Sequence, residues 1–232
     1  MNAAPVKVHP IPLGVDCCYL LVGAGGQAVL IDAGMARQSR RFAHRLAEID
    51  ISPSQIGLLL ITHCHWDHIG SARAIRDLTA AKVAVHSAEK SRLEHGAAVM
   101  PPGVTTWGRT FGRLVRLMGL LYPVQPCPVD IAVDDSGLDL SPYGIPGRVL
   151  HTPGHSPGSL TVLLDDGHAF VGDLAMNGPP LRFGPGLPIF AEQPERLASS
   201  WRTVLDAGAR TIHPAHGKPF PAEVMRLAVS YR

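Results

Sequence analysis

The nine residues Thr62-His63-Cys64-His65-Trp66-Asp67-His68-Ile69-Gly70 constrain this chain more than any other stretch. They place three imidazoles and one carboxylate within six residues, directly after the apolar run Gly57 to Ile61. Neither a hydrophobic core nor a solvent-facing surface needs this combination, whereas a divalent metal ion binds these side chains readily. One segment cannot complete a coordination shell, so further ligands are expected elsewhere in the chain.

Composition limits the class of protein. The 232 residues are 46% hydrophobic and 17% charged, which predicts a sizeable buried core, and the net charge of +2 argues against a general nucleic-acid binder. Residues 1–10 lack the basic and apolar regions of a secretory signal, and no run approaches the ~18 apolar residues of a membrane span. The four cysteines show no zinc-finger spacing and are expected to be free thiols. A cytoplasmic protein is therefore predicted.

Short apolar runs predict strands, and apolar residues at i, i+4 and i+7 predict helices. The expected strands are 6–9, 17–22, 28–31, 57–61, 82–86, 131–133, 138–140, 148–151, 160–164, 168–171 and 211–213. The expected helices are 37–49, 71–78, 88–95, 195–205 and 223–229. The close spacing of the strands from 131 to 171 favours antiparallel meanders. Strand-rich stretches with helices between them occur twice, which predicts a layered α/β sandwich formed by one domain of residues 1–232.

Residues 97–129 differ from the rest of the chain. They contain five prolines and no acidic residue, and Arg109, Arg113 and Arg116 recur at i, i+4 and i+7 beside many apolar residues. The pattern predicts a basic amphipathic helix inserted between the sheet-forming stretches. Three roles remain open for this insert: a lid or wall over the active site, a homodimer interface, or contact with a membrane surface.

The spacing of the opening motif predicts two neighbouring sites. In an extended chain His63 and His65 face the same side while Cys64 points away, and Asp67 and His68 follow where the chain bends. Three later loops each carry one further candidate just past a strand end, in a glycine-flanked turn. These candidates are His155, Asp173 and His216. Imidazoles and carboxylates suit zinc, and also iron or manganese.

The pattern His63-x-His65-x-Asp67-His68, followed by His155, Asp173 and His216, resembles the metallo-β-lactamase-fold hydrolase superfamily over nearly the whole chain. The resemblance implies a four-layer αββα sandwich with the site at one edge of the sheets. It also implies that His63, His65 and His155 hold one metal ion, that Asp67, His68 and His216 hold a second, and that Asp173 bridges both. Ala215 is a small departure, because many relatives have glycine before the last histidine.

The function implied is hydrolysis of a small-molecule ester, thioester or lactone, with two divalent ions, zinc first among them. Two ions ~3.5–4 Å apart lower the pKa of a shared water toward ~7, so that a metal-bridged hydroxide can attack while the ions polarise the substrate oxygen. Asp67 can orient this hydroxide as well as bind metal. Asp32, which opens the turn after a strand, is expected to form that turn or to support a ligand. His151 is expected to have a structural or supporting role.

Departures from particular branches of the superfamily narrow the activity. The β-lactamases have Cys or Ser where this chain has Asp173, and the acyl-homoserine lactonases have Tyr where it has Met176. Glyoxalase II resembles the chain around Thr152 to Ser159 but carries a further glutathione-binding domain, and the RNA-processing nucleases carry RNA-gripping additions. Two alternatives stay open: a persulfide dioxygenase with a single iron, and a phosphodiesterase of the same fold.

Overall fold

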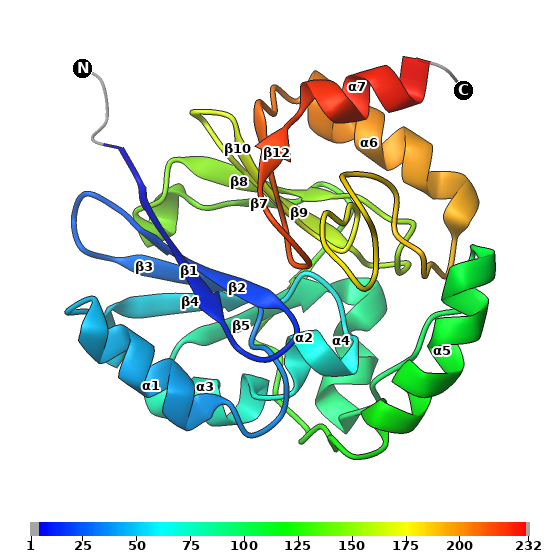
Figure 1. The fold of residues 1–232 in the computed structure, drawn as a ribbon. Helices are drawn as coiled ribbons and strands as arrows, with labels where there is room; N and C mark the ends of the chain where they lie inside the picture. Colours follow the sequence, from blue (N-terminus) through cyan, green and yellow to red (C-terminus); the bar gives the residue numbers. More distant parts are fainter. Residues whose placement is uncertain (1–4, 231–232) are drawn as a thin grey trace.

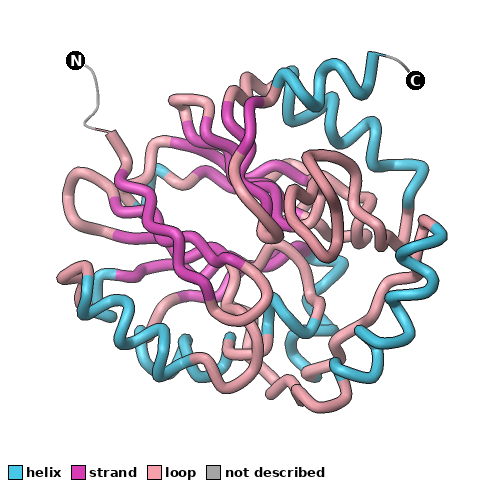
Figure 2. Tube along the Cα trace, in the orientation of Figure 1, coloured by secondary structure: helices cyan, strands magenta, loops and turns pink. Residues whose placement is uncertain are grey.

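Two six-stranded β-sheets lie face to face at the centre of the computed structural model, which describes residues 5–230 (Figure 1). Helices cover the outer face of each sheet (Figure 2). The predicted four-layer αββα sandwich is therefore confirmed. The ends of the predicted domain, residues 1–4 and 231–232, lie outside the described residues.

The first sheet has the strand order β1-β2-β3-β4-β5-β6. Its strands are β1 (Lys7–Pro12), β2 (Cys17–Val22), β3 (Ala28–Ile31), β4 (Ile56–Leu60), β5 (Lys82–His86) and β6 (Ile131–Val133). The first three pair antiparallel, and β3 to β6 pair parallel. Leu58 and Leu60 pack in the core between the sheets, while Leu59 packs in the core under the outer helices. Because both faces of β4 are buried, its sequence is a continuous apolar run.

The second sheet has the order β12-β11-β10-β9-β8-β7. Its strands are β7 (Leu138–Asp139), β8 (Gly147–His151), β9 (Leu160–Leu164), β10 (His168–Gly172), β11 (Thr211–Pro214) and β12 (Phe220–Pro221). Strands β7 to β10 form the antiparallel meander that the sequence predicts. Strand β11 then pairs parallel with β10.

Three hydrophobic cores separate the four layers. The helices are α1 (Ser39–Glu48), α2 (Trp66–Ile69), α3 (Ala72–Thr79), α4 (Ser87–His95), α5 (Thr106–Gly119), α6 (Leu197–Asp206) and α7 (Glu223–Ser230). Phe42 of α1 packs in the core beneath the first sheet, Phe170 of β10 lies between the sheets, and Trp201 of α6 packs beneath the second sheet. No helix within residues 5–230 is long and apolar enough to cross a membrane.

The carboxyl ends of five strands meet at one edge of the sandwich. Strands β3 and β4 are parallel neighbours in the first sheet, and β8, β10 and β11 run in a common direction in the second. The Leu160 amide donates to the Thr62 carbonyl at 2.9 Å, which joins the two sheets at this edge. The loops that leave these strands therefore emerge together.

Helix α5 lies within the predicted insert and stands beside this edge, outside both sheets (Figure 1). The Thr105 hydroxyl caps its first turn by accepting from the Gly108 amide at 2.9 Å. Gly108 faces the body of the protein so closely that a Cβ there would lie 2.3 Å from the Ile189 carbonyl oxygen, and a Cβ at Gly112 would lie 3.1 Å from the Phe190 ring. Glycines on its inner face therefore let α5 pack tightly against residues 189–190.

The structure corrects the prediction for one strand and adds two elements. β6 was expected in an antiparallel meander but pairs parallel with β5 in the first sheet. The long connection through α4 and α5 permits the crossover that a parallel pair needs. Helix α2 and strand β12 were not predicted, because four and two residues are too short to show a period.

We expect Gly108→Ala to destabilise the protein. Alanine normally stabilises a helix interior by about 1 kcal/mol relative to glycine, but here the added Cβ would collide with the Ile189 carbonyl, and overpacking of this kind costs ~1–3 kcal/mol. Gly119→Ala is the matched control, because a Cβ there would meet Trp66 at an ordinary 3.5 Å. Urea unfolding measures both variants, and equal stability of the two would contradict the close packing of α5.

Candidate metal centre

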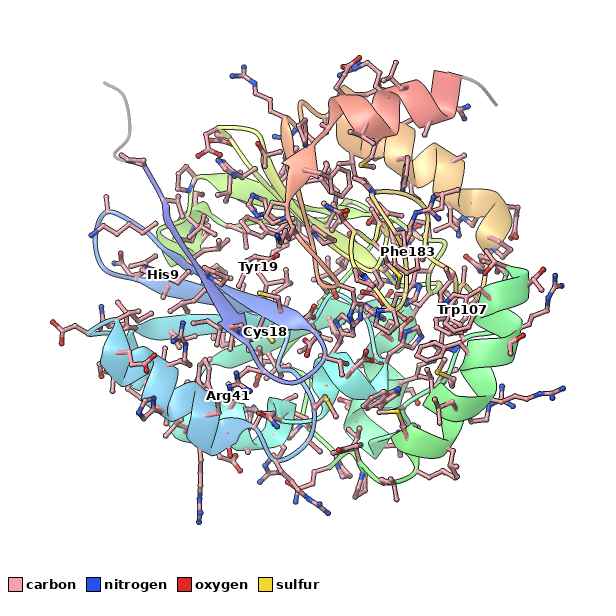
Figure 3. The ribbon with its side chains drawn as sticks, viewed as in Figure 1. His9, Cys18, Tyr19, Arg41, Trp107 and Phe183 are labelled. Atoms are coloured by element: carbon pink, nitrogen blue, oxygen red, sulfur yellow. The ribbon has the colours of Figure 1, made fainter. Side chains whose placement is uncertain are left out.

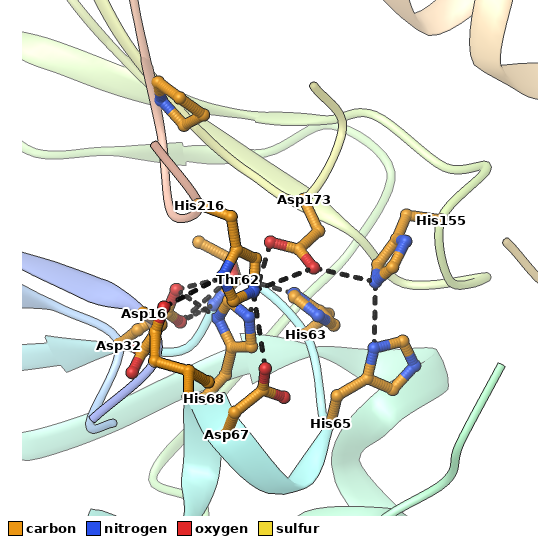
Figure 4. Close-up of polar contacts among 12 residues, drawn as sticks. Asp16, Asp32, Thr62, His63, His65, Asp67, His68, His155, Asp173 and His216 are labelled. Atoms are coloured by element: carbon orange, nitrogen blue, oxygen red, sulfur yellow. Dashed lines mark hydrogen bonds and ion pairs between the residues drawn. The ribbon is translucent and has the colours of Figure 1, made fainter. Parts of the chain in front are cut away.

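The seven predicted ligand residues lie together where the strands end (Figure 4). Four of them follow β4, and the other three follow β8, β10 and β11. All are buried except Asp67, which is partly exposed. The folded chain thus collects side chains that are up to 153 positions apart, from His63 to His216.

Three of the histidines form a first donor group: His63, His65 and His155. Their ring centroids lie 4.4–4.6 Å apart, and His155 Nε2 lies 2.9 Å from His65 Nδ1. Between the first two, the Cys64 thiol points away and donates to the Glu89 carbonyl at 3.6 Å. The alternation predicted from the His-x-His spacing is confirmed.

A second donor group consists of Asp67, His68 and His216. His216 Nε2 lies 3.3 Å from Asp67 Oδ2. The carboxylate of Asp173 faces both groups, because its Oδ1 lies 3.5 Å from His68 Nε2 and its Oδ2 lies 3.4 Å from both His155 Nε2 and His216 Nε2. One carboxylate therefore stands where the two donor groups meet.

Outer hydrogen bonds fix the orientation of four imidazoles. In each ring Nδ1 faces an acceptor and Nε2 turns inward. The pairs are His63 Nδ1 with Thr62 Oγ1 at 3.0 Å, His68 Nδ1 with Asp32 Oδ2 at 2.9 Å, His155 Nδ1 with the Phe190 carbonyl at 2.8 Å, and His216 Nδ1 with the Val15 carbonyl at 3.1 Å. When these rings are neutral, Nε2 therefore presents its lone pair to the centre, which is the form that binds a metal ion.

The buried atoms at the centre fit a metal ion. Nε2 of His63, Nε2 of His68 and Oδ1 of Asp173 have no hydrogen-bond partner among the described residues. Burying several such acceptors against one another is costly unless a cation lies between them. The donor set of imidazoles and carboxylates is the one that zinc, iron and manganese bind.

Asp32 supports the site, which is one of the two roles that the sequence left open for it. Its φ of +63° lies in the left-handed region, which aspartate tolerates better than most residues. Its carboxylate accepts from the Thr62 amide at 2.7 Å, from the Thr62 hydroxyl at 2.8 Å and from His68 Nδ1 at 2.9 Å. Asp32 therefore orients a member of each donor group, His68 directly and His63 through Thr62.

An acidic and basic network behind His65 was not found from the sequence. Glu192 Oε1 lies 3.7 Å from His65 Nε2, and the Arg92 guanidinium donates two hydrogen bonds of 2.8 Å to the Glu192 carboxylate. Burial alone would raise the pKa of Glu192, but His65 and Arg92 lower it to about 2. Arg92 also contacts the fully buried Glu89, which accepts from the Gly158 amide at 3.2 Å. Arg92 and Glu192 are 100 positions apart, so no local pattern connects them.

Asp16 is a second buried carboxyl that the sequence did not point to. It precedes β2 at the same edge, and burial raises its pKa to about 7.

His151 has the supporting role expected of it, because its Nε2 donates to the Pro157 carbonyl at 2.9 Å in the loop that carries His155.

A separate cluster of His86, Asp135 and His151 has the composition of a metal site but not the hydrogen bonds of one. The Ala88 amide donates to His86 Nδ1 at 3.2 Å, which leaves the ring proton of a neutral His86 on Nε2, facing Asp135 at 3.1 Å. Nε2 of such a ring could bind a metal ion only after the neutral imidazole lost its last proton, which does not happen near pH 7.

The two donor groups differ in charge. Burial alone would lower the pKa of both His68 and His216. The carboxylates of Asp32, Asp173 and Asp67 outweigh burial at His68, and those of Asp173 and Asp67 do so at His216, so that both pKa values are raised well above the usual value. In the first donor group, burial and neighbouring histidines lower the pKa of His63 well below its usual value and that of His155 to about 3. Without metal, protons therefore belong to the second donor group at neutral pH.

Comparison with known proteins agrees with this geometry. Residues 15–216 match the family model described as the metallo-beta-lactamase superfamily, and the chain belongs to that superfamily. It is 26% identical over 197 residues to the Beta-lactamase-like protein 2 homolog of Drosophila melanogaster, covering 85% of this chain and 57% of that protein. It is 27% identical over 219 residues to the probable metallo-hydrolase YflN of Bacillus subtilis (strain 168), covering 86% and 81%. The crystal structure of TTHA1623 in a di-iron-bound form matches with a TM-score of 0.68 and 26% identity, covering 94% of this chain and 96% of that one.

Asp32→Asn is expected to weaken metal binding about 10–100-fold while the fold is kept. Asparagine tolerates the same positive φ, but it lacks the charge that draws the His68 proton outward. Asp50→Asn is the control, because Asp50 is an exposed aspartate with a φ of +56° just past the end of α1 and is not among the candidate ligands. Competition with a chromophoric chelator measures the affinity, and equal affinity of the two variants would contradict the role of Asp32.

Metal binding is expected to release protons near pH 7. Because the folded pKa values of His68 and His216 are raised, both hold a proton that a metal ion must displace, whereas the lowered pKa values of His63 and His155 leave those rings neutral. Calorimetric titration of metal-free protein with zinc, in buffers of different ionisation enthalpy, counts these protons. Lowering the pH to about 5.5 should weaken metal binding by the second donor group more than metal binding by the first. Binding without proton release would contradict this charge assignment.

Proposed function

We propose that the two donor groups each hold one divalent metal ion, that Asp173 bridges the ions, and that the protein hydrolyses an ester, thioester or lactone of a small molecule. The observation that carries the proposal is the convergence of inward acceptor atoms from both groups on the single carboxylate of Asp173. The similarity to a protein solved in a di-iron-bound form supports two ions. Zinc is the first choice for this donor set, with iron or manganese as alternatives.

Bound ions would supply an activated water and polarise the substrate carbonyl. The chain's own contribution begins with Asp67, whose carboxylate is the most exposed of the seven candidates and lines the cavity above the site. Burial alone would raise the pKa of Asp67, but His68 and His216 lower it, so the group is ionised and can orient the attacking water by accepting a hydrogen bond from it. His216 holds this carboxylate in place from the side of Asp173.

Other residues keep the donor atoms in position. Asp32 and Thr62 hold the motif that follows β4, and the Phe190 carbonyl fixes the His155 ring. The charged carboxylate of Glu192, which is paired with Arg92, lies beside the His65 ring. Pre-set ligands of this kind lower the reorganisation needed when substrate binds. The proposal includes a cytoplasmic location, in which the four free cysteines would stay reduced.

Metal analysis of purified protein, followed by activity assays on the same sample, tests the proposal. We expect two equivalents of metal and chelator-sensitive hydrolysis of at least one ester, thioester or lactone. A single iron with oxygen consumption in the presence of a persulfide would replace the proposal with a thiol dioxygenase. Turnover confined to phosphodiesters would replace it with a phosphodiesterase.

Asp173→Ala is expected to lose one metal equivalent and nearly all turnover while the protein still folds. The substitution removes the only carboxylate that faces both donor groups in the described part of the chain. Asp206→Ala, at an exposed position on α6, is the control. Elemental analysis and circular dichroism on both variants separate metal loss from unfolding. Unchanged metal content in Asp173→Ala would contradict a bridging role.

A further inference from the structure

The cavity above the candidate metal centre has a polar floor and apolar walls. Its floor includes Asp67, His155, Asp173 and His216, and its volume is about 180 Å³. This is small beside the ~300–1,000 Å³ of pockets that bury drug-sized ligands. The part of a substrate that enters this cavity must therefore be small.

Helix α5 and the segment after β10 form most of the walls. Helix α5 contributes Phe111, Val115 and Met118, and the segment after β10 contributes Met176 and Leu181 among others. Further wall residues are Val15, Trp66, Met100, Pro101 and Phe190. Apart from the candidate metal ligands, every residue that lines the cavity is a glycine or has an apolar or aromatic side chain. Trp66 carries the one polar side-chain atom among these wall residues, its indole nitrogen.

The basic residues of α5 do not line the cavity. Arg109, Arg113 and Arg116 are exposed on the helix, whereas Phe111 and Val115 lie on its inner side and are partly buried. Trp107 at the start of α5 and Phe183 on the loop after β10 are labelled in Figure 3, and the Trp107 indole N–H donates to the Pro180 carbonyl of that loop at 2.9 Å. A phosphate or carboxylate group placed against these walls, away from the metal centre on the floor, would lose its water and find no cationic side chain, which is costly.

We propose that this cavity is an acyl-chain site, so that the substrate is a neutral ester, thioester or lactone with a short to medium, unbranched aliphatic chain. This inference rests on the proposed function for the bond that is cleaved, and on the cavity alone for the chain. The carbonyl lies at the floor beside Asp67, and the chain lies along the inner face of α5. Val115 and Met118 then set the longest chain that fits.

Chain length should determine affinity in a regular way. Moving one methylene from water to an apolar wall contributes about fourfold in binding, which corresponds to ~0.8 kcal/mol. The gain should continue until the cavity is full and then stop. A terminal carboxylate on a chain of the same length should remove the gain.

Two measurements on metal-loaded protein test the proposal. The first is calorimetric binding of acetate, butyrate, hexanoate and octanoate, whose common carboxylate isolates the effect of the chain. The second is kcat/KM for p-nitrophenyl esters of the same acids, with the hemisuccinate ester as the charged comparison for the butyrate. We expect both quantities to rise about fourfold for each methylene up to a limit, and the hemisuccinate to be hydrolysed at least tenfold less efficiently than the butyrate.

Two variants test whether the acyl chain of the substrate lies against α5. Val115→Phe fills part of the cavity and should shift the preferred chain to a shorter one, whereas Met118→Ala enlarges it and should shift the preference to a longer one. Leu117→Phe is the matched control, because Leu117 is 62% exposed on the same helix and does not line the cavity. Thermal unfolding of all three variants shows whether each is folded.

The outcomes separate this proposal from the proposed function. Fatty-acid binding that does not change with chain length, or Val115→Phe behaving like Leu117→Phe, overturns the acyl-chain site even if esters are hydrolysed. Binding that rises with chain length and responds to Val115→Phe supports the site. If no ester, thioester or lactone is then turned over, hydrolysis is wrong and the acyl-chain site stands.

Discussion

The structure depends on the interaction between buried imidazole nitrogens and one buried carboxylate. Inward-facing nitrogens from two donor groups converge on the Asp173 carboxylate, and several of these buried atoms have no hydrogen-bond donor within the described residues. Such a centre costs free energy in the folded state unless cations occupy it. Metal binding is thus expected to contribute directly to the stability of the native fold.

The αββα scaffold holds this centre by fixing what lies behind each ligand. Parallel directions of β3 with β4, and of β8 with β10 and β11, bring five loop starts to one edge. There Asp32 restrains the motif after β4, while backbone carbonyls restrain His155 and His216. Four of the five histidine rings therefore have Nδ1 fixed outward by a hydrogen bond, and this leaves Nε2 for the site. The inner face of α5 closes the cavity above it with apolar side chains.

The sequence predicted most of this centre because metal ligands need particular residue types at short spacings. The His-x-His-x-Asp-His pattern is local, and His155, Asp173 and His216 each follow a recognisable strand in a glycine-flanked turn. The partners that face each other across the fold carried no such signal. Glu192 meets Arg92 and His65 only because separate loops converge, and the parallel pairing of β6 depends on the crossover through α4 and α5. Spacing within a segment reveals local geometry, whereas tertiary pairing is decided by the packing of the layers.

The central claim is that Asp173 stands between two metal ions, and a crystal structure of the metal-loaded protein recorded at the absorption edge of the bound metal tests it most directly. The account predicts two anomalous peaks ~3.5–4 Å apart. One peak should be bound by His63, His65 and His155, the other by Asp67, His68 and His216, and an oxygen of Asp173 should contact each. A single peak, or two peaks with Asp173 bound to neither, would contradict the account.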